Sequence, residues 1–166
     1  MITNLINYKT INYINNNCSS YILDTLESVK NQTYTSIELF IIDDGLESCL
    51  ATDDLPPSVA VISANVAHQE KYKDALIEFI PELVIYLATT VSADQKRGFE
   101  SVLGLSNICE IGSMTSNFQI LYIQSFLTRD VSKPVNSNSP VSPGESYGTW
   151  KMAGEYLLQA YSGKKT

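Results

Sequence analysis

The sequence predicts a layered α/β domain in which a mostly parallel β-sheet is flanked by helices. Short apolar segments alternate along the chain with segments of helical periodicity, which is typical of strand–helix–strand units. Residues 37–42 form an unbroken apolar run, as expected of a strand covered on both faces. With 166 residues, of which 44% are hydrophobic, the chain is long enough to bury a core without disulfides or bound metal.

The start of the chain predicts one strand–helix–strand unit. Residues 10–14 alternate in polarity and favour a short first strand, which an Asn-rich loop follows. Residues 20–31 then place apolar side chains at helical spacing behind a serine N-cap. The apolar run at 37–42 forms the second strand and ends at Asp43-Asp44-Gly45.

The alternation continues through the middle of the chain. A Pro-Pro pair precedes a third strand at 58–63, and a helix over 69–80 ends at Pro81. Residues 83–87 predict a fourth strand. Because helices connect the strands, the strands are expected to run parallel.

The last third is less regular. Residues 97–105 predict a helix, whereas residues 117–127 suit either a strand or a helix. Residues 131–148 are rich in Ser, Pro and Asn without periodicity, which predicts a long loop. Residues 150–161 predict a final amphipathic helix. No change of composition divides the chain, so we expect one domain over residues 1–166.

The net charge limits the partners that the protein can take. Eleven Lys and Arg against eighteen Asp and Glu give a formal net charge of −7. Such a surface repels phosphate backbones and anionic lipid heads, so nucleic acid and membrane surfaces are poor partners. No apolar run is long enough to span a bilayer and no signal-peptide pattern opens the chain, so we expect a cytoplasmic protein.

Few residues offer metal or nucleophile chemistry. The three cysteines, Cys18, Cys49 and Cys109, are widely spaced, which indicates free thiols rather than a zinc site or a disulfide framework. His68 is the only histidine, which excludes a multi-histidine metal site. The glycine-rich phosphate motifs GxGxxG and GxxxxGK[ST] do not occur in the sequence.

Two acidic residues, Asp43 and Asp44, directly follow the apolar strand at 37–42. In open α/β sheets, ligands bind beyond the carboxyl ends of the strands. Carboxylates placed there accept hydrogen bonds from a base N–H or a ribose hydroxyl. The alternative is a solvated Asp-Gly turn, since this dipeptide is common in turns.

Residues 21–45 closely resemble the start of the family 2 glycosyltransferases, which have the GT-A fold. They read YILDTLESVKNQTYTSIELFIIDDG, against a family pattern close to Y-I-x-x-T-L-x-S-V-x-N-Q-T-Y-x-x-I-E, four apolar residues and D-D-G-S. Weaker similarity continues in four later segments, residues 58–65, 73–78, 82–87 and 144–151. The resemblance implies a single GT-A-like, Rossmann-type domain with a nucleotide-binding half, 1–92, and a reduced acceptor-side half, 93–166.

The resemblance also implies a nucleotide-sugar site at the carboxyl ends of the strands. Asp44 takes the position that accepts the base N–H, with Asp43 beside it, and Asn16 stands where the family has a base-stacking tyrosine. Lys73 stands where an arginine approaches the diphosphate, a change that keeps the charge but loses bidentate geometry. The implied ligand is a nucleotide diphosphate sugar, with a UDP-linked sugar as one candidate.

The metal motif of that family is missing from this chain. After the fourth strand the family carries D-x-D or D-D, which holds Mn²⁺ or Mg²⁺, whereas residues 87–92 contain no carboxylate. Asp53 and Asp54 imitate the motif but precede the third strand. We therefore assign no residue as a metal ligand. If Mn²⁺ or Mg²⁺ binds, it does so without the carboxylates that usually hold it in this family. Lys73 is then expected to neutralise charge on the departing diphosphate.

Glu145 is the candidate general base, because the aspartate that follows it in the family is Ser146 here. Trp150 is interpreted as packing on a helix face. These residues lead to the hypothesis of a small glycosyltransferase-like protein that binds a nucleotide diphosphate sugar and transfers the sugar with inversion. One alternative is a catalytically inactive glycosyltransferase-like binding or assembly module that partners another copy or another protein. A third is an unrelated α/β binding protein.

Overall fold

The computed structural model describes residues 8–14, 28, 31, 37–43, 59–88, 94–115 and 119–163. Within these residues, one five-stranded sheet has the order β3-β2-β1-β4-β5, and every neighbouring pair of strands is parallel. The strands are β1 (Tyr8–Ile14), β2 (Ile37–Asp43), β3 (Val59–Ser63), β4 (Leu83–Tyr86) and β5 (Gln119–Tyr122). This is the order of a doubly wound, Rossmann-like sheet, so the predicted fold class is confirmed.

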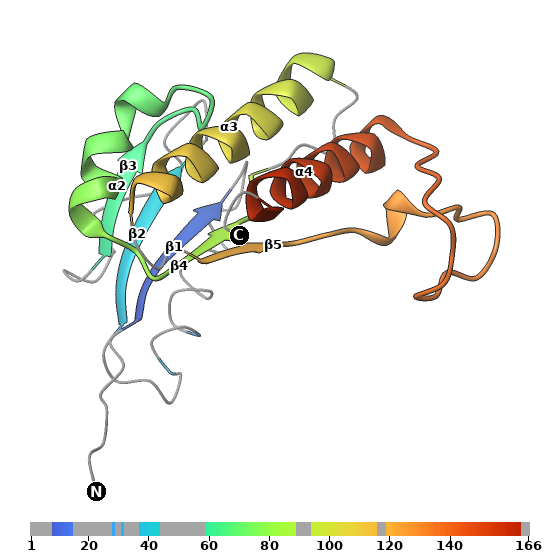
Figure 1. The fold of residues 1–166 in the computed structure, drawn as a ribbon, viewed down its shortest axis with the longest axis horizontal. Helices are drawn as coiled ribbons and strands as arrows, with labels where there is room; N and C mark the ends of the chain where they lie inside the picture. Colours follow the sequence, from blue (N-terminus) through green and yellow to red (C-terminus); the bar gives the residue numbers. More distant parts are fainter. Residues whose placement is uncertain are drawn as a thin grey trace, which may run out of the picture.

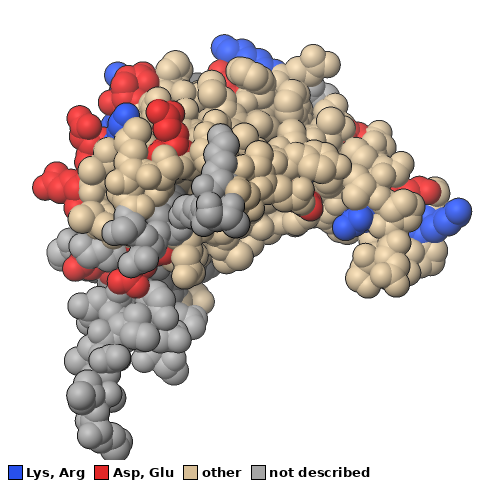
Figure 2. Space-filling view, in the orientation of Figure 1, with Lys and Arg blue, Asp and Glu red and all other residues tan. Residues whose placement is uncertain are grey.

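In the described part of the chain, three α-helices lie side by side over one face of the sheet (Figure 1), and the middle helix contacts both of the others. They are α2 (Lys73–Phe79), α3 (Gln95–Met114) and α4 (Ser146–Ser162), and the short 3₁₀ helices are η2 (Gln69–Lys71) and η3 (Phe126–Thr128). In the same view, acidic side chains gather over the α2 side of the molecule, whereas the face over α3 and α4 is largely uncharged (Figure 2).

Local signals fix where these helices begin and end. Asp94 caps α3, and its carboxylate accepts hydrogen bonds from the backbone N–H of Lys96 at 2.9 Å and of Arg97 at 3.4 Å. Helix α2 ends at Phe79, and the next residue, Ile80, has a left-handed φ of 47° and precedes Pro81. Such a φ is strained for a β-branched residue, and the proline prevents the helix from continuing.

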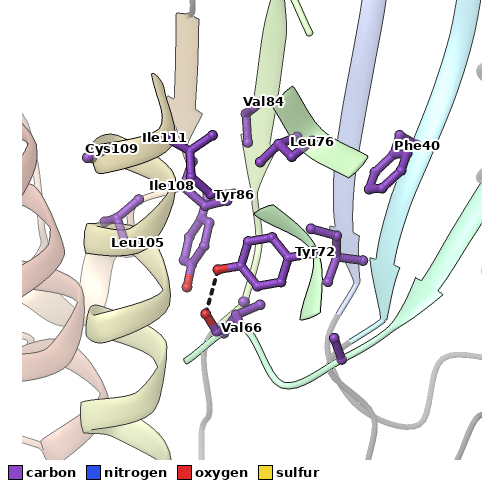
Figure 3. Packing of buried hydrophobic residues seen from close by; sticks show 13 residues of the cluster. Phe40, Val66, Tyr72, Leu76, Val84, Tyr86, Leu105, Ile108, Cys109 and Ile111 are labelled. Atoms are coloured by element: carbon purple, nitrogen blue, oxygen red, sulfur yellow. Dashed lines mark hydrogen bonds between the residues drawn. The ribbon is translucent and has the colours of Figure 1, made fainter. Parts of the chain in front are cut away.

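The core lies between the sheet and these helices (Figure 3). Ile42 of β2 and Val84 of β4 pack with Leu105 and Ile108 of α3, and all four side chains are fully or almost fully buried. Each such side chain contributes about 1.5–3 kcal/mol when it is fully removed from water. Packing on this face of the sheet therefore stabilises the described part of the chain.

Two buried tyrosines satisfy their hydroxyls on backbone carbonyls inside this core. Tyr72 donates to Val66 O at 2.7 Å, as drawn in Figure 3, and Tyr86 donates to Ser101 O at 2.5 Å. A buried hydroxyl without a partner would be destabilising, so these bonds fix the orientation of both rings.

The structure refines several predicted boundaries. The helix predicted over 69–80 is divided into η2 and α2, because Tyr72 turns inward between them. Helix α3 runs on to Met114, since buried apolar residues continue its inner face beyond residue 105. The ambiguous segment 117–127 contains β5 and η3. Helix α4 begins at Ser146, so the predicted loop is shorter than expected. Nearly all of the helix predicted at 20–31 lies outside the described residues.

No helix in the described part of the chain is long and apolar enough to cross a membrane. The division into a nucleotide-binding half, 1–92, and an acceptor-side half, 93–166, remains a prediction.

Candidate functional site

The carboxyl ends of the parallel strands meet at one edge of the sheet. Asp43, the last residue of β2, lies in register with Ile14 at the end of β1 and with Ser63 at the end of β3. The order of the strands reverses at β1, which lies between β2 and β4. Ligands of open α/β sheets bind at this kind of switch point, so the fold places Asp43 at the edge where the sequence predicted it.

The other predicted site residues are distributed differently. Asp44 and Asn16 lie outside the described residues. Lys73 begins α2 and Glu145 directly precedes α4. Because α3 lies between α2 and α4, the structure does not bring Lys73 and Glu145 together.

Glu145 instead borders a pocket of about 300 Å³ between the starts of α3 and α4. Its walls combine polar side chains with one aromatic ring, and they come from Gln95, Pro143, Gly144, Glu145, Ser146, Thr149 and Trp150. The indole of Trp150 occupies the space beside Gly98, where any β-carbon would collide with it. Trp150 therefore packs on a helix face as predicted, while it also forms one wall of this pocket.

Lys151 is the most unusual side chain near the start of α4. It is only 2% exposed, and its Nζ donates a 2.7 Å hydrogen bond to the backbone O of Ile123, one residue beyond β5. The same Nζ lies 4.8 Å from the ring centroid of Tyr122 and 5.8 Å from that of Tyr147. No carboxylate among the described residues pairs with it, and burial lowers the pKa of Lys151 to about 8.

The sequence builds this arrangement through spacing and small residues. Tyr147 and Lys151 are four residues apart on α4 and so share one face of the helix. Gly148 lies between them, where a β-carbon would overlap the backbone O of Leu127. Without that side chain, the first turn of α4 can approach the segment that follows β5.

Tyr122 anchors α4 to β5 beneath this site. Its hydroxyl donates to the backbone O of Lys151 at 3.2 Å, in space left by Gly154, where a β-carbon would overlap the Tyr122 hydroxyl. Burial raises the pKa of Tyr122 well above its usual range, and Tyr147 and Glu155 add to this effect. Tyr122 therefore stays neutral and serves as a structural support.

Ser125 follows β5 at the same end of the sheet. Its Oγ accepts a hydrogen bond from the backbone N–H of Leu127 at 3.2 Å, which leaves its hydroxyl proton available. The buried amine of Lys151 and the half-buried phenol of Tyr147 thus lie together at the start of α4, and the Ser125 hydroxyl follows the end of β5. Such a set can bind hydroxyl-bearing or anionic groups and can exchange a proton with them.

Sequence reasoning missed Tyr147, Lys151 and Ser125 as site residues. Tyr147 was placed in a loop, and Lys151 was noted only within a family resemblance. The available signal was a Tyr-x-x-x-Lys spacing at the start of a helix, with a serine just after the preceding strand. Among the described residues, no group of three or more His, Cys, Asp or Glu is placed to hold a metal ion.

Comparison with known proteins gives a consistent set of structural neighbours. A UDP-Glc/GlcNAc 4-epimerase from Campylobacter jejuni superposes with a TM-score of 0.74 at 16% identity, covering 95% of this chain and 50% of the epimerase. A dTDP-glucose 4,6-dehydratase from Bacillus anthracis, in complex with NAD, has a TM-score of 0.73 at 11% identity, covering 95% of this chain and 51% of the dehydratase. The Bordetella bronchiseptica enzyme WbmG, in complex with NAD, has a TM-score of 0.67 at 24% identity, covering 96% and 52%.

No family model and no curated protein matches the sequence. The chain spans about half the length of each of these structural neighbours, and the identities are low, so the likeness establishes the fold alone. It contradicts the glycosyltransferase interpretation, because the neighbours are Rossmann-fold sugar epimerases and dehydratases rather than GT-A enzymes.

The glycosyltransferase resemblance failed for a physical reason. It was strongest over residues 21–45, whose sequence predicts a helix followed by a buried strand, and this local sequence pattern occurs in many α/β folds. The part of the chain after β4 distinguishes a Rossmann-like fold from the GT-A interpretation. After β4 the chain continues into α3, a fifth parallel strand and α4, the winding of a Rossmann-like sheet. Transfer of a sugar with Glu145 as base is therefore withdrawn.

Proposed function

We propose that this chain is a nucleotide-sugar-binding domain of the type found in sugar epimerases and dehydratases. The observation that carries the proposal is the buried Lys151 amine, held beneath Tyr147 on the same face of α4 and beside the end of β5. Two of the structural neighbours are named for reactions of nucleotide sugars. A further structure of WbmG is in complex with NAD and UDP.

The chemistry that we assign to Tyr147 and Lys151 is proton exchange with a sugar hydroxyl. The Tyr147 phenol is the group that accepts or donates the proton, and Ser125 offers a hydrogen bond to the same hydroxyl. The Lys151 amine, which burial holds near the balance between charged and neutral forms at pH 8, adjusts the charge beside the phenol.

The site residues that the sequence predicted are included in this proposal as contacts to the nucleotide and the sugar. Asp43, with Asp44 after it, is assigned to a ribose hydroxyl or a base N–H, because ligands of open α/β sheets bind beyond the carboxyl ends of the strands. We assign Asn16 to the base and Glu145 to a sugar hydroxyl in the pocket beside Trp150. The contact of Lys73 with a diphosphate stays a prediction from the sequence, because α3 separates Lys73 from that pocket.

The residues present do not fit an NAD dinucleotide as the Rossmann fingerprint holds it. That fingerprint needs glycines directly after the first strand, so that the backbone can approach the pyrophosphate. Here β1 ends at Ile14, and residues 15–20 read Asn-Asn-Asn-Cys-Ser-Ser, with the first glycine of the chain at Gly45. We therefore assign no hydride step to this chain and expect NAD to bind more weakly than a nucleotide sugar.

A thermal-shift panel tests the proposal with UDP, UDP-glucose, dTDP-glucose and NAD⁺ as separate probes. A ligand that binds only the folded state raises the melting temperature by mass action. We expect a shift with at least one nucleotide sugar and a smaller shift with NAD⁺. If the nucleotide sugars gave no shift, or NAD⁺ gave the largest one, the proposal would be wrong.

Two lysine variants locate the effect. Lys151→Met should weaken sugar-nucleotide binding at least about tenfold, which corresponds to ~1.4 kcal/mol. Lys133→Met, at an exposed position far along the loop before α4, should leave binding unchanged. If both variants bound the sugar nucleotide with equal affinity, Lys151 would not belong to the binding site.

A further inference from the structure

We infer that the pocket between the starts of α3 and α4 holds the sugar ring of the nucleotide sugar and selects uncharged sugars over uronates, in which the sugar carries a carboxylate. This inference rests on the proposed function and deepens it, because it names the class of sugar that the same site takes. The volume of the pocket is about 300 Å³. Small-molecule sites span about 300–1,000 Å³, so this pocket suits a single sugar ring rather than a whole dinucleotide.

Trp150 gives the pocket an aromatic wall. The pyrrole edge of its indole lies against Gly98 of α3, where the lack of a side chain leaves room for the ring. Trp150 is half-buried, and the rest of the ring borders the pocket. The face of an aromatic ring is apolar and carries partial negative charge, so it attracts the C–H groups on the apolar face of a sugar ring.

The polar groups of the pocket are available to a ligand. Glu145 is the N-cap residue of α4, yet its side chain makes no capping hydrogen bond. The Thr149 hydroxyl donates to the backbone O of Glu145 at 3.2 Å, which leaves its oxygen able to accept. Gln95 adds an amide that can both donate and accept. Neighbouring sugar hydroxyls also donate and accept, so they match this mixture of groups.

The charge of the pocket argues against an anionic occupant. Glu145 is the only charged residue among the described residues that line it, so no lysine or arginine there neutralises a phosphate or a carboxylate. Two N–H groups in the first turn of α3, which would otherwise attract an anion, already donate to the Asp94 carboxylate. A uronate in the pocket would place its carboxylate beside Glu145, where like charges repel.

An entirely apolar ligand fits no better, because it would remove the Glu145 carboxylate from water without giving it a partner. An uncharged sugar avoids both penalties. Its position also agrees with the chemistry assigned to Tyr147, since Ser146 lines the pocket and directly precedes Tyr147 in the first turn of α4.

The fluorescence of Trp150 tests this inference, because Trp150 is the only tryptophan of the chain and lines the pocket. UDP, UDP-glucose and UDP-glucuronate are titrated separately, and calorimetry measures each affinity. We expect UDP-glucose to change the Trp150 emission and UDP to leave it unchanged. UDP-glucose should bind at least about tenfold more tightly than UDP-glucuronate, because of the charge repulsion in the pocket.

Two glutamate variants assign the preference to one carboxylate. Glu145→Gln keeps the size of the side chain and removes its charge, so UDP-glucuronate should then bind within about threefold of UDP-glucose. The matched control is Glu110→Gln, which removes an exposed carboxylate near the other end of α3 and should keep the wild-type preference.

The outcomes separate this inference from the proposed function. If UDP-glucose bound without changing the Trp150 emission, or if UDP-glucuronate bound equally well, the inference would be wrong and the proposed function would be unaffected. A preference that persisted in Glu145→Gln, or that disappeared equally in Glu110→Gln, would also overturn it. If none of the three ligands bound, the inference would fail, and the thermal-shift panel shows whether the proposed function fails with it.

Discussion

Lys151 of α4 and Ile123, one residue beyond β5, are joined by a 2.7 Å hydrogen bond from the lysine Nζ to the backbone carbonyl oxygen of Ile123. This bond fixes the position of a buried amine that has no carboxylate partner among the described residues. Burying an unpaired ammonium group is costly, so its presence at this edge of the sheet requires a reason. The nucleotide-sugar site proposed above gives this amine a role.

The first prediction concerns the pH dependence of stability. The pKa of Lys151 is about 8 in the folded protein against its ordinary 10.5, so the unfolded chain binds more protons between these values. The free-energy penalty for burying the charged form of Lys151 is therefore present in full below pH 8 and decreases as the pH rises. From pH 7.5 to 9, the wild-type protein should gain about 1 kcal/mol in unfolding free energy relative to Lys151→Met. Urea titrations of both proteins at each pH measure this difference. If the unfolding free energies of the two proteins changed in parallel with pH, the prediction would be wrong.

The second prediction uses a glycine pair as a matched comparison. Gly148→Ala should destabilise the protein by about 1–3 kcal/mol, because the added methyl overlaps the backbone O of Leu127, which cannot move aside easily. Gly144→Ala has open space around the new methyl and should be neutral or slightly stabilising. Thermal unfolding compares the two. Equal melting temperatures would show that α4 does not approach Leu127 as described.

The third prediction concerns the buried amide of Asn107. Its Nδ2 donates to the backbone O atoms of Val66 and Ala67, both at 3.1 Å, and so ties α3 to the turn after β3. Asn107→Ala should cost about 1–3 kcal/mol, because at least one carbonyl is left without a partner. Asn138→Ala, on the exposed loop, serves as the control. Chemical denaturation that placed both variants within error of the wild type would rule out this role.

The fourth prediction concerns the reactivity of Cys109. Burial raises the pKa of its thiol to about 11, so almost no thiolate forms at pH 8. In a Cys18→Ser/Cys49→Ser background, a thiol reagent should modify the folded protein slowly and the urea-unfolded protein quickly. Equally rapid modification of the folded protein would show that Cys109 is not buried as the structure has it.

The sequence was sufficient for the fold because the determining signals are local. The apolar run of β2, the proline after α2 and the alternation of strand and helix each predict their element without knowledge of the rest. By contrast, residues 21–45 matched a glycosyltransferase pattern because sequences that predict a helix followed by a buried strand are alike in several folds. Local similarity therefore predicted the architecture correctly and the family wrongly.

The site could not be predicted in the same way. The role proposed for Lys151 depends on its contacts with Ile123 and Tyr122. These residues are distant from Lys151 in sequence and contact it only when α4 packs on β5. Placing the start of α4 four residues too late also hid the face that Tyr147 and Lys151 share. Asp43 was predictable because its position follows directly from the end of an apolar strand.

A titration of isotopically labelled protein with UDP-glucose, followed by amide chemical shifts, tests the central claim most directly. The account predicts saturable shifts that concentrate around residues 122–125 and 145–151 and at Asp43, and their loss in Lys151→Met. Shifts confined to other surfaces, or no shifts at all, would contradict a nucleotide-sugar site at the start of α4.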